Sequence, residues 1–271
     1  MTAAIESRPA PPAREWTNAR KIGTGLLAFW ALLGLGLIYY LVTRWNPQFF
    51  ETYFSRYMHG LWITIELVVI SIILGALLSV PVAWARMSKN KVANAIASGF
   101  VYFFRSTPLL AQLYLINYGL GSFRGFWEPL GLWWFFREPW WCAILSFTLN
   151  TAAYQAEILR GALQSLPKGQ WEGAASLALP NMLTLRKIIA PQALIVALRP
   201  YGNEIILMIK GSAIVALVTI YDLMGETRRA YSQTFDFQAY IWAAIIYLAI
   251  VETLRRVIDW IEARITRHLV R

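Results

Sequence analysis

The 271-residue sequence contains few residues of the kinds that perform catalysis or bind metals. It has a single cysteine, Cys142, and two separated histidines, His59 and His268, so it forms no intrachain disulfide and we expect no metal site. Charged residues make up 15% of the chain, compared with about a quarter in soluble domains. No Walker A, His-Glu-x-x-His or Gly-x-Ser-x-Gly pattern occurs, which excludes ATP binding through a Walker A loop and disfavours two classes of hydrolase. We therefore expect no catalytic residue and no cofactor in this chain.

Apolar residues are abundant instead, and they occur in long runs. They account for 58% of the sequence, and the mean hydropathy is +0.47. A helix needs about 20 apolar residues to cross the hydrocarbon core. Six windows approach or exceed that length, although the last is short: 22–43, 57–85, 92–119, 139–162, 193–221 and 239–254. The sequence thus predicts an all-α membrane protein.

Two patterns inside these windows predict how the helices pack. Ser71, Gly75, Ser79 and Ala83 recur at every fourth position, which gives one small helix face and permits close contact with another helix. Prolines at positions 81, 108 and 200 each remove a backbone hydrogen bond, and we expect each to kink its helix.

Basic residues are distributed unevenly between the connections, and the chain has a net charge of +10. Sixteen of the 25 lysines and arginines fall on the side that holds both termini, and six fall on the other side. The positive-inside rule therefore predicts that both termini and residues 164–192 are cytosolic, so the charge indicates membrane topology rather than nucleic-acid binding. We expect 1–21 to be a disordered cytosolic tail, 22–44 an extra transmembrane helix, and 257–271 a basic cytosolic tail.

The stretch 164–192 contains a short helix of small residues that Gly169 and Pro180 delimit. It reads Gly-Gln-Trp-Glu-Gly-Ala-Ala-Ser-Leu-Ala from Gly169 and Ile-Ile-Ala-Pro from Ile188. This stretch resembles the EAA loop of permease subunits in bacterial ATP-binding-cassette (ABC) importers, the segment that contacts the ATPase. The resemblance implies ATPase-coupling residues at positions that match the pattern or lie beside it: Gly169, Glu172, Gly173, Ala174, Ala178 and Pro191. Gly173 replaces an alanine of that pattern, Ala178 replaces a glycine and Ala190 replaces a leucine.

Three further segments strengthen the resemblance. Residues 104–112 (FRSTPLLAQ) and 153–161 (AYQAEILRG) are similar to segments of polar amino-acid permeases. Residues 199–208 (RPYGNEIILM) resemble the fourth core helix in the M-type subunit of histidine/lysine/arginine/ornithine and octopine/nopaline permeases. This similarity implies the type I ABC importer permease fold over 57–256, with five core transmembrane helices and one extra N-terminal transmembrane helix.

The same resemblance implies a bacterial inner-membrane importer of polar, basic amino acids or opines. Its partners would be a second permease subunit, two ATPase subunits that bind ATP and magnesium, and a periplasmic solute-binding protein. Two alternatives remain from the residues alone. A secondary transporter or channel would use the intramembrane Glu and Lys residues for ions or protons, whereas a membrane enzyme is disfavoured because the catalytic motifs above are missing.

Polar residues inside apolar spans are candidates for the substrate path, because a charge at the bilayer centre is costly. The candidates are Glu66, Arg105, Thr107, Tyr154, Glu157, Asn203 and Glu204. For several of these positions a structural role is the competing interpretation. Glu157 lies three residues before Arg160 and could form an ion pair with it, and Glu172 could simply favour the start of its helix through the helix dipole. Asn150 and Thr151 are expected to form interhelical hydrogen bonds.

Overall fold

A computed structural model describes residues 16–268, and within this range the chain is helical and contains no strand. The chain divides into two compact units, Met1–Phe50 and Glu51–Arg271. The first contains helix α1, Asn18–Thr43, whose N-cap residue Thr17 accepts a hydrogen bond from the Arg20 amide at 3.4 Å. Helix α1 therefore includes residues 18–21, which were assigned to the tail, whereas residues 1–15 lie outside the described range.

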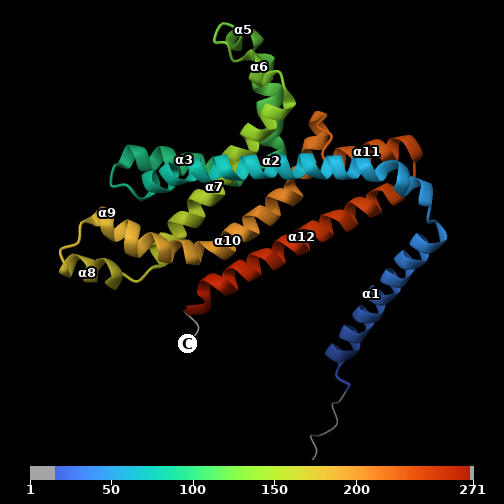
Figure 1. The fold of residues 1–271 in the computed structure, drawn as a ribbon, viewed down its shortest axis with the longest axis horizontal. Helices are drawn as coiled ribbons and strands as arrows, with labels where there is room; N and C mark the ends of the chain where they lie inside the picture. Colours follow the sequence, from blue (N-terminus) through green and yellow to red (C-terminus); the bar gives the residue numbers. More distant parts are fainter. Residues whose placement is uncertain (1–15, 269–271) are drawn as a thin grey trace, which may run out of the picture. The chain divides into compact units, whose positions relative to one another are not determined.

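The second unit is a helical bundle built around α7 (Pro139–Ser165) and α10 (Ala190–Gly211). Helix α7 packs against α10, and α10 packs against α12 (Gln238–Ile265). Figure 1 shows α10 passing between α2 (Pro47–Met87) and α12. The central apolar cluster draws side chains from each of these regions and includes Leu67, Phe147, Met208 and Val215. Branched and aromatic side chains are buried in this cluster, and their burial stabilises the arrangement of the four long helices.

The small face of α2 packs closely, as predicted. Ser71, Gly75, Ser79 and Ala83 are all buried. A Cβ atom added at Gly75 would approach the Cγ2 methyl group of Thr151 on α7 more closely than real Cβ atoms come to other atoms. The absence of a side chain at Gly75 thus sets the distance between α2 and α7 at this level.

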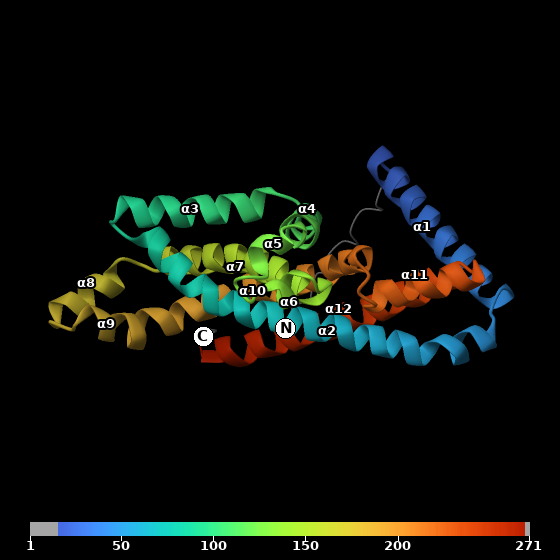
Figure 2. The same cartoon turned by 90° about the horizontal axis from the view of Figure 1, so that it is seen from above.

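The window 92–119, in contrast, is not one helix. Helix α3 (Lys91–Ser106) ends at Thr107, which is extended with φ −105° and ψ 145°. The residue before a proline avoids the helical region because the proline ring would clash with it, so Pro108 ends α3 rather than kinking it. The chain then turns into α4 (Leu109–Tyr114), and Figure 2 shows α3 and α4 running in different directions.

Short helical segments follow this break and lead to α7. A π-helical turn, Leu115–Gly119, and a 3-10 turn, Leu120–Ser122, precede α5 (Arg124–Trp127) and α6 (Trp133–Phe136). Rings stack where this region folds back on itself, with Trp127 and Phe136 centroids 4.1 Å apart. Figure 1 shows α5 and α6 projecting from the end of α7.

The C-terminal part of the chain returns through the bundle. Helix α10 is continuous through Pro200 and leads into a 3-10 segment, Ser212–Val218, which ends at Thr219. Asp222 caps α11 (Leu223–Thr234) by accepting a hydrogen bond from the Gly225 amide at 2.8 Å. Helix α12 continues to Ile265, past the predicted boundary at 256.

Within residues 16–268, three helical segments are long and apolar enough to cross a membrane: Asn18–Thr43, Pro47–Met87 and Asn181–Val218. Helices α7 and α12 contain 27 and 28 residues, about 40 Å at 1.5 Å per residue, and carry more polar side chains. Helix α2 also continues through Pro81 without interruption. The count of five core helices and one extra helix remains a prediction.

Candidate functional site

The segment that resembles a coupling loop folds into a separate short helix, α8 (Gly169–Ser176), followed by α9 (Asn181–Thr184) and a π-helical turn, Leu185–Ile189. Ala174 is the buried residue of α8, at 4% exposure, whereas Glu172 and Trp171 are exposed. Figures 1 and 2 both show α8 and α9 at one end of the second unit. The segment is therefore anchored through Ala174 and presents its other side chains outward.

A hydrogen-bonded turn at Ala178 follows the C-terminal end of α8. The amides of Ala178 and Leu179 donate to the carbonyls of Ala175 and Ala174 at 2.9 and 3.0 Å. Ala178 has φ 52°, a left-handed conformation that favours glycine because a Cβ atom is strained there. The family pattern has glycine at this position, and the structure supplies the physical reason.

Gly173 and Gly169 have open space around them, so a Cβ atom at either would meet no atom within 4 Å. The alanine that the family pattern places at position 173 therefore fits this backbone. Pro191 is the second residue of α10, directly after the π-helical turn Leu185–Ile189. The neighbouring Gln192 donates to the Ile188 carbonyl at 2.9 Å and reaches Gln170 at 3.5 Å, which connects α8 to the start of α10.

A second group of polar residues surrounds Glu157 on α7. Arg86 on α2 donates to the Glu157 carboxylate at 2.6 Å, and Arg160 pairs with the same carboxylate. These side chains are 21% to 25% exposed. The predicted ion pair between Glu157 and Arg160 is present, and Arg86 extends it to a link between two helices.

Two cavities of about 300 and 460 Å³ lie beside this ion-pair cluster, and both are lined by Arg105, Tyr154 and Glu157. The Arg105 guanidinium lies over the Tyr154 ring, 5.2 Å from its centroid, while the Tyr154 hydroxyl donates to the Arg105 carbonyl at 3.4 Å. Stacking holds the Arg105 side chain at the cavity wall through cation–π attraction. The smaller cavity also reaches Pro200.

Glu204 on α10 is buried at 6% exposure and accepts a hydrogen bond from the Thr151 hydroxyl at 3.0 Å. The Thr151 hydroxyl in turn accepts from Gln155 at 3.0 Å, and the Gln155 amide also donates to the Ile72 carbonyl at 3.3 Å. These contacts join α2, α7 and α10 through polar groups that apolar side chains surround.

Thr107 and Asn150 form hydrogen bonds that stabilise the break between α3 and α4. The Gln112 side-chain amide donates to the Thr107 hydroxyl at 2.8 Å and to the Phe104 carbonyl at 2.9 Å. Asn150 on α7 donates to the Phe104 carbonyl and to the Gln112 side chain, both at 3.0 Å. The interhelical hydrogen bonds predicted for Asn150 and Thr151 are thus confirmed, and Thr107 has a clear structural role.

Two candidates lie apart from these groups. Asn203 is exposed, and Glu66 on α2 is partly exposed. Neither lines the two cavities beside Glu157. The structure therefore brings Arg105, Tyr154 and Glu157 together at the two cavities and places Glu204 in the hydrogen-bonded group with Thr151. Glu66 and Asn203 lie apart from both groups.

Sequence reasoning overlooked Arg86 and Gln155 as members of the polar groups. Arg86 was counted only as a cytosolic charge, and its pairing across 71 positions leaves no local signal. Gln155 lies four residues after Thr151, a spacing at which two polar side chains share one helix face, and that spacing could have indicated it.

The sequence is similar to inner-membrane permease proteins of transport systems. The family described as "Binding-protein-dependent transport system inner membrane component" matches residues 71–267. The chain is 41% identical over 217 residues to the nopaline transport system permease protein NocM of Agrobacterium fabrum, covering 80% of this chain and 90% of that protein. It is 32% identical to the arginine ABC transporter permease protein ArtM of Escherichia coli, covering 78% and 95%.

Solved structures show the same similarity in three dimensions. The structure described as an amino acid ABC transporter with histidines aligns with a TM-score of 0.72 at 30% identity, covering 81% of this chain and 98% of that one. An inward-facing MetNI methionine ABC transporter aligns with a TM-score of 0.64 at 20% identity, which shows a shared fold.

Proposed function

The chain belongs to the inner-membrane components of binding-protein-dependent transport systems, and we propose that it is the permease subunit of an ABC importer for basic amino acids or opines. Relatives whose names state nopaline and arginine transport support this substrate class. The alternative of a secondary transporter or channel is not favoured by these relatives. ATP hydrolysis belongs, in this proposal, to two copies of a separate ATPase subunit that bind ATP and magnesium.

The observation that carries the proposal is the exposure of α8. A short helix held by one buried alanine, with Glu172 and Trp171 facing outward, is suited to insertion into a partner. A cavity of about 900 Å³ adjoins it, lined by Trp84, Lys168, Trp171 and neighbouring residues. We propose that Gly169, Glu172, Gly173, Ala174, Ala178 and Pro191 form the segment that docks on the ATPase. The remaining partners would be a second permease subunit and a periplasmic solute-binding protein.

The polar groups around Glu157 and Glu204 suit a cationic amino acid. A buried carboxylate at Glu204 offsets a cationic side chain, and the Arg105 guanidinium at the cavity wall suits an α-carboxylate. We propose that Arg105, Tyr154, Glu157 and Glu204 border the substrate path, with Thr107 supporting it. Glu66 and Asn203 remain candidates for other points along the path.

Coupling is tested by Glu172→Lys in the transporter reconstituted with its ATPase. The reversed charge in a docked helix adds repulsion and desolvation, so we expect at least a tenfold loss of ATP-driven uptake, while the protein still inserts in the membrane. Gln170→Lys, which adds one positive charge on the same helix where Glu172→Lys changes the charge by two, shows whether added positive charge alone reduces uptake. Unchanged uptake together with normal stimulation of the ATPase would contradict docking through Glu172.

A further inference from the structure

An apolar groove of about 800 Å³ lies between α2, α10 and α12. Branched side chains line it almost throughout, among them Ile65, Ile72, Ile209, Ile250 and Val257. The one hydroxyl in the lining, that of Thr253, donates to the Ala249 carbonyl of its own helix at 2.7 Å. The groove therefore offers no free polar group to an amino acid.

The groove is separate from the polar cavities. On α10 it is lined by Ile205 and Ile209, whereas Pro200 and Glu204 face the polar side of the helix. At 100° per residue these two pairs lie about 140° apart around the helix axis. The helix thus divides the groove from the polar groups that we assign to the substrate path.

On two faces of helix α12, the first charged residue occurs at different positions along the helix axis. One face carries Glu252, Arg255, Arg256, Asp259 and Glu262 from the middle of the helix onward. The groove face stays apolar along Ile246, Ile250, Val257 and Trp260, at the three- and four-residue spacing of one helical stripe, and meets its first charge at Arg264. Arg264 lies about 18 Å further along the axis than Glu252.

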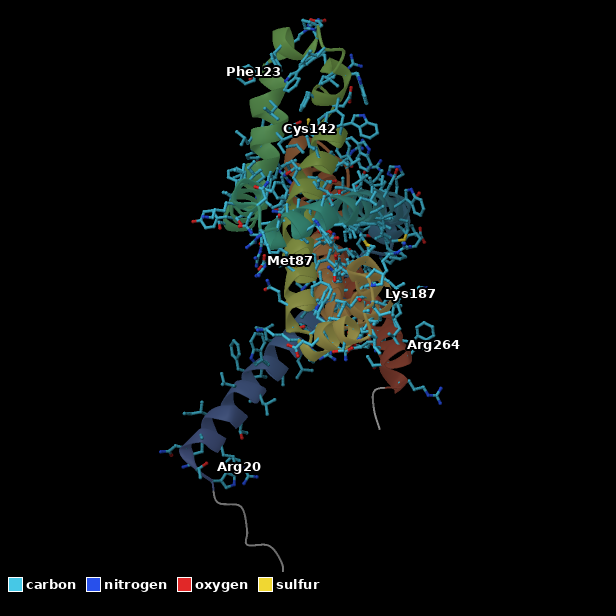
Figure 3. The ribbon with its side chains drawn as sticks, turned by 90° about the vertical axis from the view of Figure 1, so that its left-hand side faces the viewer. Arg20, Met87, Phe123, Cys142, Lys187 and Arg264 are labelled. Atoms are coloured by element: carbon cyan, nitrogen blue, oxygen red, sulfur yellow. The ribbon has the colours of Figure 1, made fainter. Side chains whose placement is uncertain are left out.

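Trp260 and Arg264 form a pair at the end of this stripe. The Arg264 guanidinium lies 5.3 Å from the centroid of the Trp260 ring, and both side chains are exposed. Figure 3 labels Arg264 near the end of α12. Tryptophan and arginine at the end of an apolar span are typical of the membrane interface, where lipid headgroups lie.

We propose that this groove holds an acyl chain of an anionic phospholipid whose phosphate binds Arg264 beside Trp260. Charge complementarity favours an anionic headgroup, because Arg255 and Arg256 pair with Asp259 and Glu252 whereas Arg264 forms no ion pair within the described residues. The lining favours a lipid chain over a second helix, since helices in membranes associate through small residues. This chain uses small residues for that purpose at Ser71, Gly75, Ser79 and Ala83, whereas isoleucine and valine predominate in the groove.

The test is lipid binding to the purified full-length protein, measured by native mass spectrometry with phosphatidylglycerol and phosphatidylcholine of identical acyl chains. We expect about a fivefold preference for phosphatidylglycerol, because one basic residue near a membrane surface contributes about 1 kcal/mol. Arg264→Gln should abolish the preference. Arg255→Gln is the matched control, since Arg255 lies on the opposite side of α12 and pairs with Asp259 at 4.0 Å.

Location in the groove is tested with a photoactivatable group in the acyl chain. Crosslinks should fall on α2 and α12 around Ile65, Ile72, Ile250 and Val257, and Ile250→Trp should suppress them by filling the groove. Equal binding of the two lipids, equal effects of Arg264→Gln and Arg255→Gln, or crosslinks elsewhere would overturn the proposal. Disulfides between two copies through a cysteine introduced at Val257 would show that a second subunit covers the groove instead, and would overturn it as well.

Discussion

The Thr151 hydroxyl on α7 donates a hydrogen bond to the Glu204 carboxylate on α10 at 3.0 Å, with both side chains buried. A buried carboxylate needs donors, because an unsatisfied charged group retains its full desolvation cost. Thr151 also accepts from Gln155, so one hydroxyl connects the carboxylate to a third helix through the Ile72 carbonyl. The position of Glu204 therefore depends on Thr151.

Removing this donor is expected to destabilise the protein. Thr151→Val retains the side-chain shape but loses the hydroxyl, and we expect a loss of about 1–3 kcal/mol in the free energy of unfolding. Thr151→Ser keeps the hydroxyl and is the control for lost methyl packing against Gly75. Unfolding of the detergent-purified protein, followed by circular dichroism, measures both. A valine variant as stable as the unsubstituted protein, together with a destabilised serine variant, would show that the methyl group, not the hydrogen bond, matters.

Charge at Glu204 is expected to select substrates. Glu204→Gln keeps a hydrogen-bond acceptor for Thr151 but removes the negative charge that offsets a cationic side chain. We expect at least a tenfold loss of lysine or arginine uptake in the reconstituted transporter, with less than a threefold loss for glutamine. Glu66→Gln should have a weaker effect, because Glu66 is partly exposed whereas Glu204 is buried. Equal losses for cationic and neutral substrates would mean that Glu204 is structural.

Close packing of α2 and α7 gives a third prediction. Gly75→Ala places a Cβ atom against Thr151, and we expect a destabilisation of about 1–3 kcal/mol from overpacking. Gly99→Ala on α3 is the matched control, since a Cβ atom there meets no atom within 4 Å and alanine favours the helix by up to about 1 kcal/mol. Thermal unfolding compares the two variants. A Gly75→Ala protein as stable as Gly99→Ala would contradict tight packing at this crossing.

The sequence was sufficient where a pattern is local. The four-residue spacing of Ser71, Gly75, Ser79 and Ala83 predicted a packed face, and the structure confirms it. The short helix between Gly169 and Pro180 was also predicted, because glycine and proline delimit it. In both cases the information lies within one helical segment.

Hydropathy alone was insufficient at two points. It merged α3 and α4 into one window, because apolar composition continues across Thr107 and Pro108 while the backbone turns. It also ended the last window at residue 254, although the groove face of α12 remains apolar as far as Trp260. A linear average cannot separate two faces of one helix, and no local rule pairs Arg86 with Glu157.

Membrane orientation remains a prediction from the distribution of basic residues, and labelling of introduced cysteines tests it. The native Cys142 is buried, so background labelling should be low. A membrane-impermeant maleimide added to intact cells should label Gly125→Cys between α4 and α7 but not Gln170→Cys or Arg267→Cys. Permeabilised cells should show labelling at all three positions. Labelling of Gln170→Cys from outside would overturn the cytosolic location of α8.

The last prediction concerns Gly173 in α8 and Ala178 just after it, two positions where this chain departs from its family's pattern. Ala178 has φ 52°, and Ala178→Gly should relieve about 1 kcal/mol of backbone strain. Gly173→Ala fills open space within the helix and should stabilise it by about 0.5–1 kcal/mol. Both substitutions should therefore slow hydrogen exchange of the α8 amides while leaving uptake within about twofold. Gly131→Ala, at φ 68° in a different loop, should instead be destabilising, and faster exchange in α8 after Ala178→Gly would show that this turn is not strained.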